Sequence, residues 1–137
     1  MAMPKQEDYV FYLGEKFQVE FYYTERGDLP AKEYLDASDR QVQVKLLALV
    51  KFIAENGRLF DERKFRIVDK DEKIYEFKPK DDRFFNFFYE GRKIVITNAY
   101  HKHGQKVDFK ELTRAINLKK DYEIRFKGGK YYENQQT

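Results

Sequence analysis

A group of basic and protic side chains gathers in the second half of the chain, around three short segments that have the pattern of strands. The common catalytic motifs, such as a glycine-rich phosphate loop, an HExxH pair or a nucleophile elbow, do not occur in this sequence. The side chains that can do chemistry here are Lys78, Lys80, Arg83, Tyr100, His101, Lys102, His103 and Lys106.

These residue types suit cleavage of RNA without a metal ion. Attack of a 2′-hydroxyl on its own phosphate needs a base for that hydroxyl, an acid for the departing 5′-oxygen, and fixed cations near the phosphoryl oxygens. Arg83 with Lys78 or Lys106 can supply the cations, and a histidine with a pKa near its ordinary value of about 6.5 can move the proton. Aromatic rings can stack splayed bases. We expect RNA contacts from Lys80, Tyr89, Tyr100 and His103.

Each of these assignments has a plainer alternative. His101 and His103 share a face of any strand that continues through them, but no nearby carboxylates complete a metal site. We therefore expect no metal, and two surface histidines are the alternative to catalytic ones. Arg83 can equally serve only as an ion-pair partner of Asp81 or Glu76.

Three strands are predicted to form an antiparallel meander that brings the candidate residues together. The strands cover Lys73–Lys78, Arg83–Tyr89 and Arg92–Tyr100, and their links are too short for anything but hairpins. The middle strand is apolar on both faces, which favours a central position. Because the end of one strand lies beside the start of the next, Lys78, Arg83 and His101 are expected at one end of the sheet.

The remaining elements predict an α+β domain. Lys16–Thr24 alternates apolar and polar residues as a half-buried strand does. A short helix begins at Pro30, and a longer one follows Ser38 or Asp39, carries an apolar stripe from Val42 to Ile53 and ends at Gly57. A last helix runs from the capping box at Asp108 to about Lys120. We expect the order β-α-α-β-β-β-α, with the helices on one face of an antiparallel sheet and the other face free.

Length and composition limit the remaining possibilities. A chain of 137 residues predicts one domain at 16–126, with residues 1–15 as a tail or weakly docked strand and residues 127–137 as a flexible tail. The absence of cysteine excludes disulfides and thiolate chemistry, and no apolar run is long enough for a membrane span or a signal peptide. We expect a cytoplasmic protein with no membrane partner.

Charge is divided unequally along the chain. Residues 1–72 carry a formal charge of −3, whereas residues 73–137 carry +6 and most of the strand-forming aromatic segments. A polyanionic partner such as nucleic acid explains this asymmetry, and solubilising surface lysines explain it equally well.

Several segments together resemble one known family. These are Pro30-Ala31 with KEYLD, a helix ending in ENGRL, then IYEFK, RFFNFFY, KIVITNAYHKHGQK and ELTRAINLKKDY. From about Lys16 to Tyr122 the chain is similar to the RelE/ParE toxin superfamily, specifically the phage-derived HigB-like toxins of type II toxin-antitoxin systems. The resemblance implies the RelE-like fold and a ribosome-dependent endoribonuclease that cuts translated mRNA, uses no cofactor and is neutralised by a cognate antitoxin protein.

The resemblance also assigns positions to the family's functional residues. Arg83 matches the arginine that opens the central strand, and Lys102 and Lys106 match the lysines of a KKxxK segment. Lys78 stands where the family usually has an arginine, so it cannot form the same two-pronged contact with phosphate. His101 and His103 replace an aromatic residue and a lysine.

Two further functions remain open at this point. Some members of the superfamily inhibit DNA gyrase by binding it without cutting RNA, so a non-catalytic ParE-like inhibitor is the first alternative. A phage-derived domain that keeps the fold and has lost activity is the second. Cleavage of mRNA, loss of supercoiling, or neither effect distinguishes these three.

Overall fold

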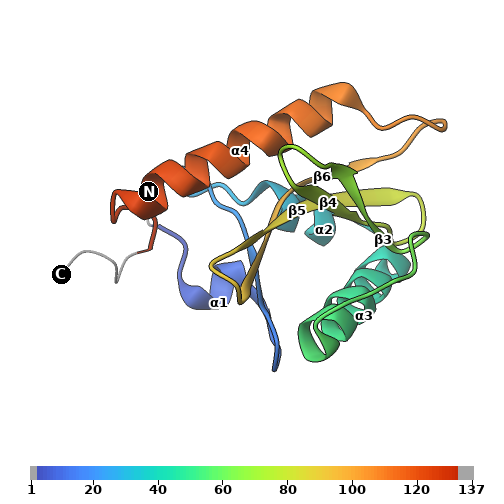
Figure 1. Ribbon diagram of the computed structural model, residues 1–137, viewed down its shortest axis with the longest axis horizontal. Coiled ribbons are helices and arrows are strands. Elements are labelled where there is room, and N and C mark those ends of the chain that lie inside the picture. The colour runs from blue at the N-terminus through green and yellow to red at the C-terminus, as the bar shows by residue number, and fades with distance from the viewer. Residues whose placement is uncertain (1–2, 133–137) are drawn as a thin grey trace.

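The computed structural model describes residues 3–132 and forms an α+β domain (Figure 1). The helices and strands, in chain order, are α1 Gln6–Tyr9, β1 Val10–Leu13, β2 Gln18–Phe21, α2 Pro30–Asp36, α3 Arg40–Asn56, β3 Phe65–Asp69, β4 Ile74–Phe77, β5 Asp82–Tyr89, β6 Lys93–His101 and α4 Phe109–Lys127. The predicted fold class is confirmed, and the order contains α1, β1 and β3 in addition to the elements expected from the sequence.

The strands form one six-stranded sheet in the order β1-β2-β6-β5-β4-β3. The predicted meander is confirmed, because β5 pairs antiparallel with both β4 and β6. The strand β2 joins the sheet parallel to β6, and the antiparallel pair of β1 and β2 forms one edge. Residues 58–71, a charged segment for which no helix or strand was predicted, supply the opposite edge strand β3.

Helices cover both faces of the sheet, so the expectation of a free face is wrong. The helix α3 packs its stripe of Val42, Leu46, Val50 and Ile53 onto one face. On the other face, α4 covers Phe85 and Phe87 of the central strand with Leu112 and Tyr122 among its contacts. Figure 1 shows α3 and α4 on opposite sides of the strands. Both faces are covered because β5 and β6 carry apolar side chains on both faces of the sheet.

The caps of the two long helices are those predicted from the sequence, but α4 is longer than predicted. The Asp39 side chain accepts a hydrogen bond from Val42 N at 2.9 Å, and Gly57 ends α3 in the left-handed conformation at φ 85°. At the start of α4, Asp108 accepts from Glu111 N at 3.1 Å. The helix then continues past Lys120 to Lys127, because Tyr122 is part of the core and Arg125 donates to the carbonyl of Tyr23 at 2.9 Å.

Residues 1–15, expected to be a tail or a weakly docked strand, and the residues expected to form a flexible carboxy-terminal tail both make specific contacts. In the amino-terminal segment, β1 pairs with β2 and Tyr9 is buried. In the carboxy-terminal segment, Tyr131 is only 2% exposed and its ring stacks on Tyr23 at 4.3 Å between centroids. Residues 133–137 lie outside the described part of the chain. The segment that follows α4 therefore contributes at least one side chain to the core.

Replacing Tyr131 by phenylalanine is expected to lower the free energy of unfolding by about 1–3 kcal/mol. The Tyr131 hydroxyl accepts a hydrogen bond from the buried Tyr23 N at 2.9 Å, so its removal leaves that N–H without this partner. Chemical denaturation measures the change. Phe109→Ala is the control, because Phe109 is 80% exposed and its loss should change stability by less than about 0.5 kcal/mol. Equal stability of Tyr131→Phe and the parent would contradict this role.

Candidate functional site

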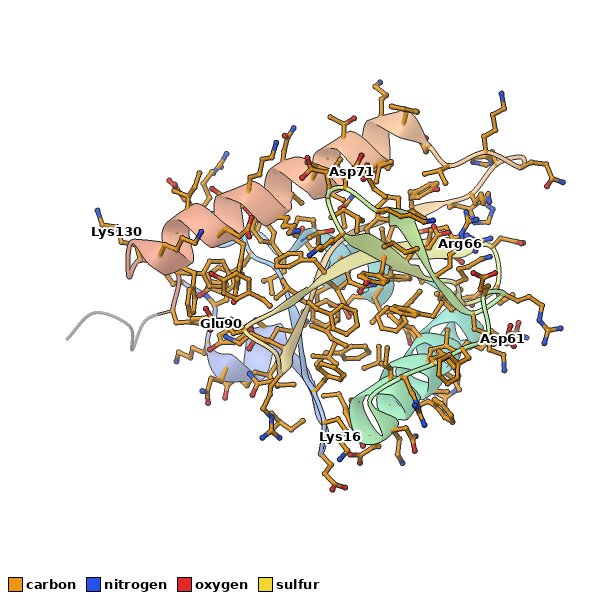
Figure 2. All side chains as sticks on the ribbon, viewed as in Figure 1. Lys16, Asp61, Arg66, Asp71, Glu90 and Lys130 are labelled. Atoms are coloured by element: carbon orange, nitrogen blue, oxygen red, sulfur yellow. The ribbon has the colours of Figure 1, made fainter. Side chains whose placement is uncertain are left out.

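Four cationic side chains lie near one another at one end of the sheet, and two of them pair with a buried carboxylate. We call them the cation cluster: Arg66 of β3, Lys78 after β4, Arg83 of β5 and Lys102 after β6, with Glu76 of β4 as the partner of the two arginines. Figure 2 labels Arg66 at this end of the sheet and Glu90, in the β5–β6 turn, at the other end. The meander together with β3 thus gathers cations from four different strands or strand ends.

The carboxylate of Glu76 lies between Arg66 and Arg83 and pairs with both. It is 1% exposed, and its Oε2 accepts a hydrogen bond from Arg66 Nε at 2.6 Å. Its Oε1 lies 4.0 Å from Arg83 Nε, and neither of these two atoms has a hydrogen-bond partner within the described residues. A buried carboxylate between two guanidinium groups holds them in place, since removing it would leave their charges uncompensated.

The Arg83 guanidinium is more enclosed than its place at a hairpin end suggested. Arg83 is 8% exposed, and its Nη1 donates to the carbonyls of Lys80 and Asp82, both at 2.9 Å. An arginine at a hairpin end is expected to be exposed and dispensable for folding, and the burial of Arg83 shows that this expectation is wrong. The predicted alternative, an ion pair between Arg83 and Glu76, is confirmed by their proximity. The same contact makes Arg83 a member of the cation cluster.

The electrostatic surroundings change the proton affinity of Lys78. Partial burial lowers the pKa of the Lys78 ammonium, and the charges of Arg66, Arg83 and Lys102 lower it further, while Glu76 acts in the opposite direction. The Lys78 Nζ also donates to the carbonyl of Glu62 at 3.1 Å. A lysine whose pKa is lowered gives up its proton more easily, so Lys78 can exchange a proton as well as supply charge.

A loop follows β6 at the same end of the sheet as the cation cluster. In this loop, residues 102–108, the backbone N of Lys102 donates to the carbonyl of Asp81 at 2.8 Å, and Asp108 N donates to the Tyr100 hydroxyl at 3.3 Å. His103 and Lys106 are exposed on the same loop. Tyr100 is 8% exposed, packs on Phe85 and has a pKa raised by burial, so its ring is not available to stack a base.

His101 lies on the other face of the sheet from the cation cluster. It pairs across the strands with Asp82, whereas Arg83 pairs with Tyr100. Because successive residues of a strand point to opposite faces, His101 turns toward α2, where its Nδ1 lies 3.4 Å from the Asp82 carboxylate. That carboxylate also accepts a hydrogen bond from the Tyr34 hydroxyl. The expectation that His101 lies at the same end of the sheet as Lys78 and Arg83 is confirmed, but its side chain is on the other face.

Two other predicted RNA contacts are also separated from the cation cluster. The Lys80 Nζ donates to the Gln41 side chain at 2.7 Å and lies 3.9 Å from Asp39, so it turns toward the start of α3. Tyr89 ends β5 beside the β5–β6 turn, where its ring packs on Tyr122 and Phe126 of α4. Sequence spacing cannot show either displacement, since both depend on which helix packs nearby.

Arg66 is the member of the cation cluster that the sequence analysis missed. It lies in β3, in the charged segment that gave no clear pattern. The signal available was local, because Phe65 and Ile67 flank it in the alternation typical of a strand. Its partner Glu76 on the neighbouring strand becomes visible only through the pairing of β3 with β4.

The arrangement can bind a phosphodiester and move a proton. Guanidinium and ammonium groups on one surface stabilise charge on phosphoryl oxygens, and Lys78 can act as an acid or base. Within the described residues, no group of three or more histidine and carboxylate side chains is placed to hold a metal ion. None of the helices in residues 3–132 is long and apolar enough to cross a membrane.

Comparison with known protein families assigns the chain to one family. A search of the curated proteins found no significant match. Residues 33–120, which include every member of the cation cluster, match the model of the family described as phage-derived protein Gp49-like (DUF891). More than half of the chain is matched, so this protein belongs to the Gp49-like family of phage-derived proteins, within the clan of RelE/HigB-like toxins.

Proposed function

We propose that this protein is the HigB-like toxin of a type II toxin-antitoxin system and cleaves mRNA on the ribosome. One observation carries the proposal: the cation cluster combines two arginines fixed by a buried carboxylate with a lysine whose pKa is lowered. Membership of the Gp49-like family is consistent with the toxin of a toxin-antitoxin system, without specifying its activity. The partners are then the ribosome, its mRNA and a cognate antitoxin, and the site of action is the cytoplasm.

In the proposed reaction each member of the cation cluster has one task. Neutral Lys78 accepts the proton of the 2′-hydroxyl as that oxygen attacks the phosphorus. The bond from phosphorus to the 5′-oxygen breaks, and the departing 5′-oxygen takes a proton from water. Arg83 and Lys102 stabilise the negative charge that grows on the phosphoryl oxygens. Arg66 holds Glu76, and through it the position of Arg83. These side chains supply the charge and the base, so the mechanism needs no cofactor.

Primer extension on a defined mRNA tests the proposal. Purified protein is incubated with ribosomes programmed with that mRNA, and in parallel with the free mRNA and with gyrase and relaxed plasmid. Cleavage at codon positions only on ribosomes supports the proposed function. Loss of supercoiling without cleavage would instead support the ParE-like alternative, and neither effect would support an inactive relative.

The variants His101→Gln and His103→Gln are expected to keep cleavage within about threefold of the parent, well short of the loss ascribed to removal of one general acid or base. His101 faces α2 across the sheet from Arg83, and His103 is exposed on the loop 102–108. The ribosomal cleavage assay, followed over pH for the double variant, measures this. A loss of a hundredfold, or disappearance of an inflection near pH 6 to 7, would return the proton transfer to histidine.

A further inference from the structure

A second cavity lies at the same end of the sheet as the cation cluster, on the face toward which His101 turns. Its volume is about 300 Å³. We call it the acidic pocket, after the three aspartates in its lining, Asp39, Asp81 and Asp82. The other lining residues come from α2 and the turn after it, from the start of α3, from the connection between β4 and β5, and from the end of β6.

The lining of the acidic pocket is negative, although the whole chain is positive. Its three aspartates face a single lysine, so the lining carries a formal charge of −2 with His101 neutral, against +3 for the chain. Lys80 lies 3.9 Å from Asp39 and compensates that carboxylate in part. Asp81 is exposed and forms no salt bridge with any residue among 3–132. The surplus of negative charge attracts a cationic ligand.

The Asp82 carboxylate supplies a hydrogen-bond acceptor that is not used within the protein. The side chain of Asp82 is only 10% exposed. Its Oδ1 accepts a hydrogen bond from the Tyr34 hydroxyl and lies 3.4 Å from His101 Nδ1. Its Oδ2 accepts no hydrogen bond from any residue of the described part of the chain. An enclosed carboxylate oxygen without a donor is costly, so a ligand that places a donor there is stabilised.

The free oxygen favours an ammonium group as that donor. A guanidinium binds best to both oxygens of a carboxylate, but Asp82 Oδ1 already accepts from Tyr34. No three histidine and carboxylate side chains among residues 3–132 are placed to hold a metal ion. An ammonium can donate to Oδ2 alone, and the Tyr34 ring and the Val42 side chain in the lining suit the methylene groups that carry it.

We infer that the acidic pocket binds a linear aliphatic diamine. One ammonium donates to Asp82 Oδ2, the methylene chain packs on Val42 and the Tyr34 ring, and the second ammonium lies near the exposed Asp81. The two positive charges of such a ligand equal the negative charge of the lining. The volume of the pocket is at the lower end of the range for small-molecule sites, which fits a short chain.

A diamine in the acidic pocket would also change the electrostatic potential beside the cation cluster. Arg83 Nη1 donates to the carbonyl of Asp82 at 2.9 Å, and Lys102 N donates to the carbonyl of Asp81 at 2.8 Å. Neutralising these two aspartates makes this end of the sheet more positive and strengthens its attraction for RNA. This consequence rests on the proposed function, whereas the binding of the diamine does not.

Isothermal titration calorimetry of the full chain with putrescine, a linear four-carbon diamine, tests the inference. The parent should bind one equivalent about tenfold or more tightly than n-butylamine, which lacks the second ammonium, or Mg²⁺, which lacks the aliphatic chain. Asp82→Asn should weaken binding about tenfold or more, because it removes the charge that accepts the ammonium. Ala37→Lys should have a similar effect, since it adds a competing ammonium at an exposed position of the lining and leaves the core unchanged.

Asp36→Asn is the matched control for Asp82→Asn. It makes the same change in net charge on a largely exposed carboxylate of α2 that pairs with Lys32 and does not line the pocket. It should change the affinity for putrescine by less than about twofold. Equal weakening by the two variants would overturn the inference, because binding would then depend on net charge alone. Equal affinity for putrescine and Mg²⁺, or no binding to the parent, would overturn it as well. The titration contains no RNA or ribosome, so it can fail while the cleavage assay succeeds, and the reverse.

Discussion

Replacing Lys78 by alanine is expected to slow ribosome-dependent cleavage by about a hundredfold or more, within the range ascribed to one general base. Lys78 is the member of the cation cluster whose pKa is lowered, by burial first and then by Arg66, Arg83 and Lys102. Its loss removes both the proton acceptor and one positive charge. Single-turnover cleavage of a defined mRNA on programmed ribosomes measures the rate.

The dependence on pH separates these two contributions. As a base, Lys78 acts in its neutral form, so cleavage by the parent should rise with pH through the Lys78 pKa, which lies below the ordinary value for lysine. Lys78→Arg keeps the charge but does not titrate in this range, so it should be slow and lose this inflection.

Lys80→Ala is the matched control for Lys78→Ala. Lys80 is two residues away and equally cationic, but its Nζ donates to Gln41 beside α3. It should cleave at nearly the parental rate. Full activity of Lys78→Ala, or an unchanged pH profile in Lys78→Arg, would remove Lys78 from the reaction and leave the proposed mechanism without its base.

Replacing Glu76 by glutamine is expected to lower the free energy of unfolding by about 3 kcal/mol. The Glu76 carboxylate is almost completely buried between Arg66 and Arg83, and neutralising it leaves the enclosed Arg83 without its counter-charge. The expected loss lies at the lower end of the range for broken buried pairs, because a third of the Arg66 side chain is exposed to water. Denaturation in urea, followed by circular dichroism, measures it.

Asp36→Asn is the control for this change in stability. It removes an ion pair with Lys32 that is largely exposed, at 3.0 Å, and such pairs contribute only about 0–1 kcal/mol. The Glu76 variant has a second expected effect, because Glu76 raises the pKa of Lys78. Its loss should move the inflection of the pH profile to lower pH. A stability equal to that of Asp36→Asn would show that Glu76 does not hold the two arginines.

Local pattern was sufficient for most of the helices and strands. The stripe and caps of α3, the capping box of α4 and the meander of β4, β5 and β6 are determined by residues close together in the chain. The edge strand β3 was missed because Phe65 and Ile67 give only a brief alternation within a charged segment, and pairing with β4 is what holds the strand in place. The end of α4 was placed too early because the partner of Arg125 is the carbonyl of Tyr23, far away in sequence.

Some features of the candidate site likewise follow from the sequence, and the others depend on the tertiary structure. Strand order and short links by themselves determined that Lys78, Arg83 and His101 lie at one end of the sheet. Only the packed sheet decided the faces, because the pairing of Asp82 with His101 turns that histidine toward α2 while Arg83 turns toward Glu76. The partnership of Arg66 with Glu76 and the lowered pKa of Lys78 likewise arise from strand pairing and burial. These are properties of contacts between distant residues, and spacing along the chain does not contain them.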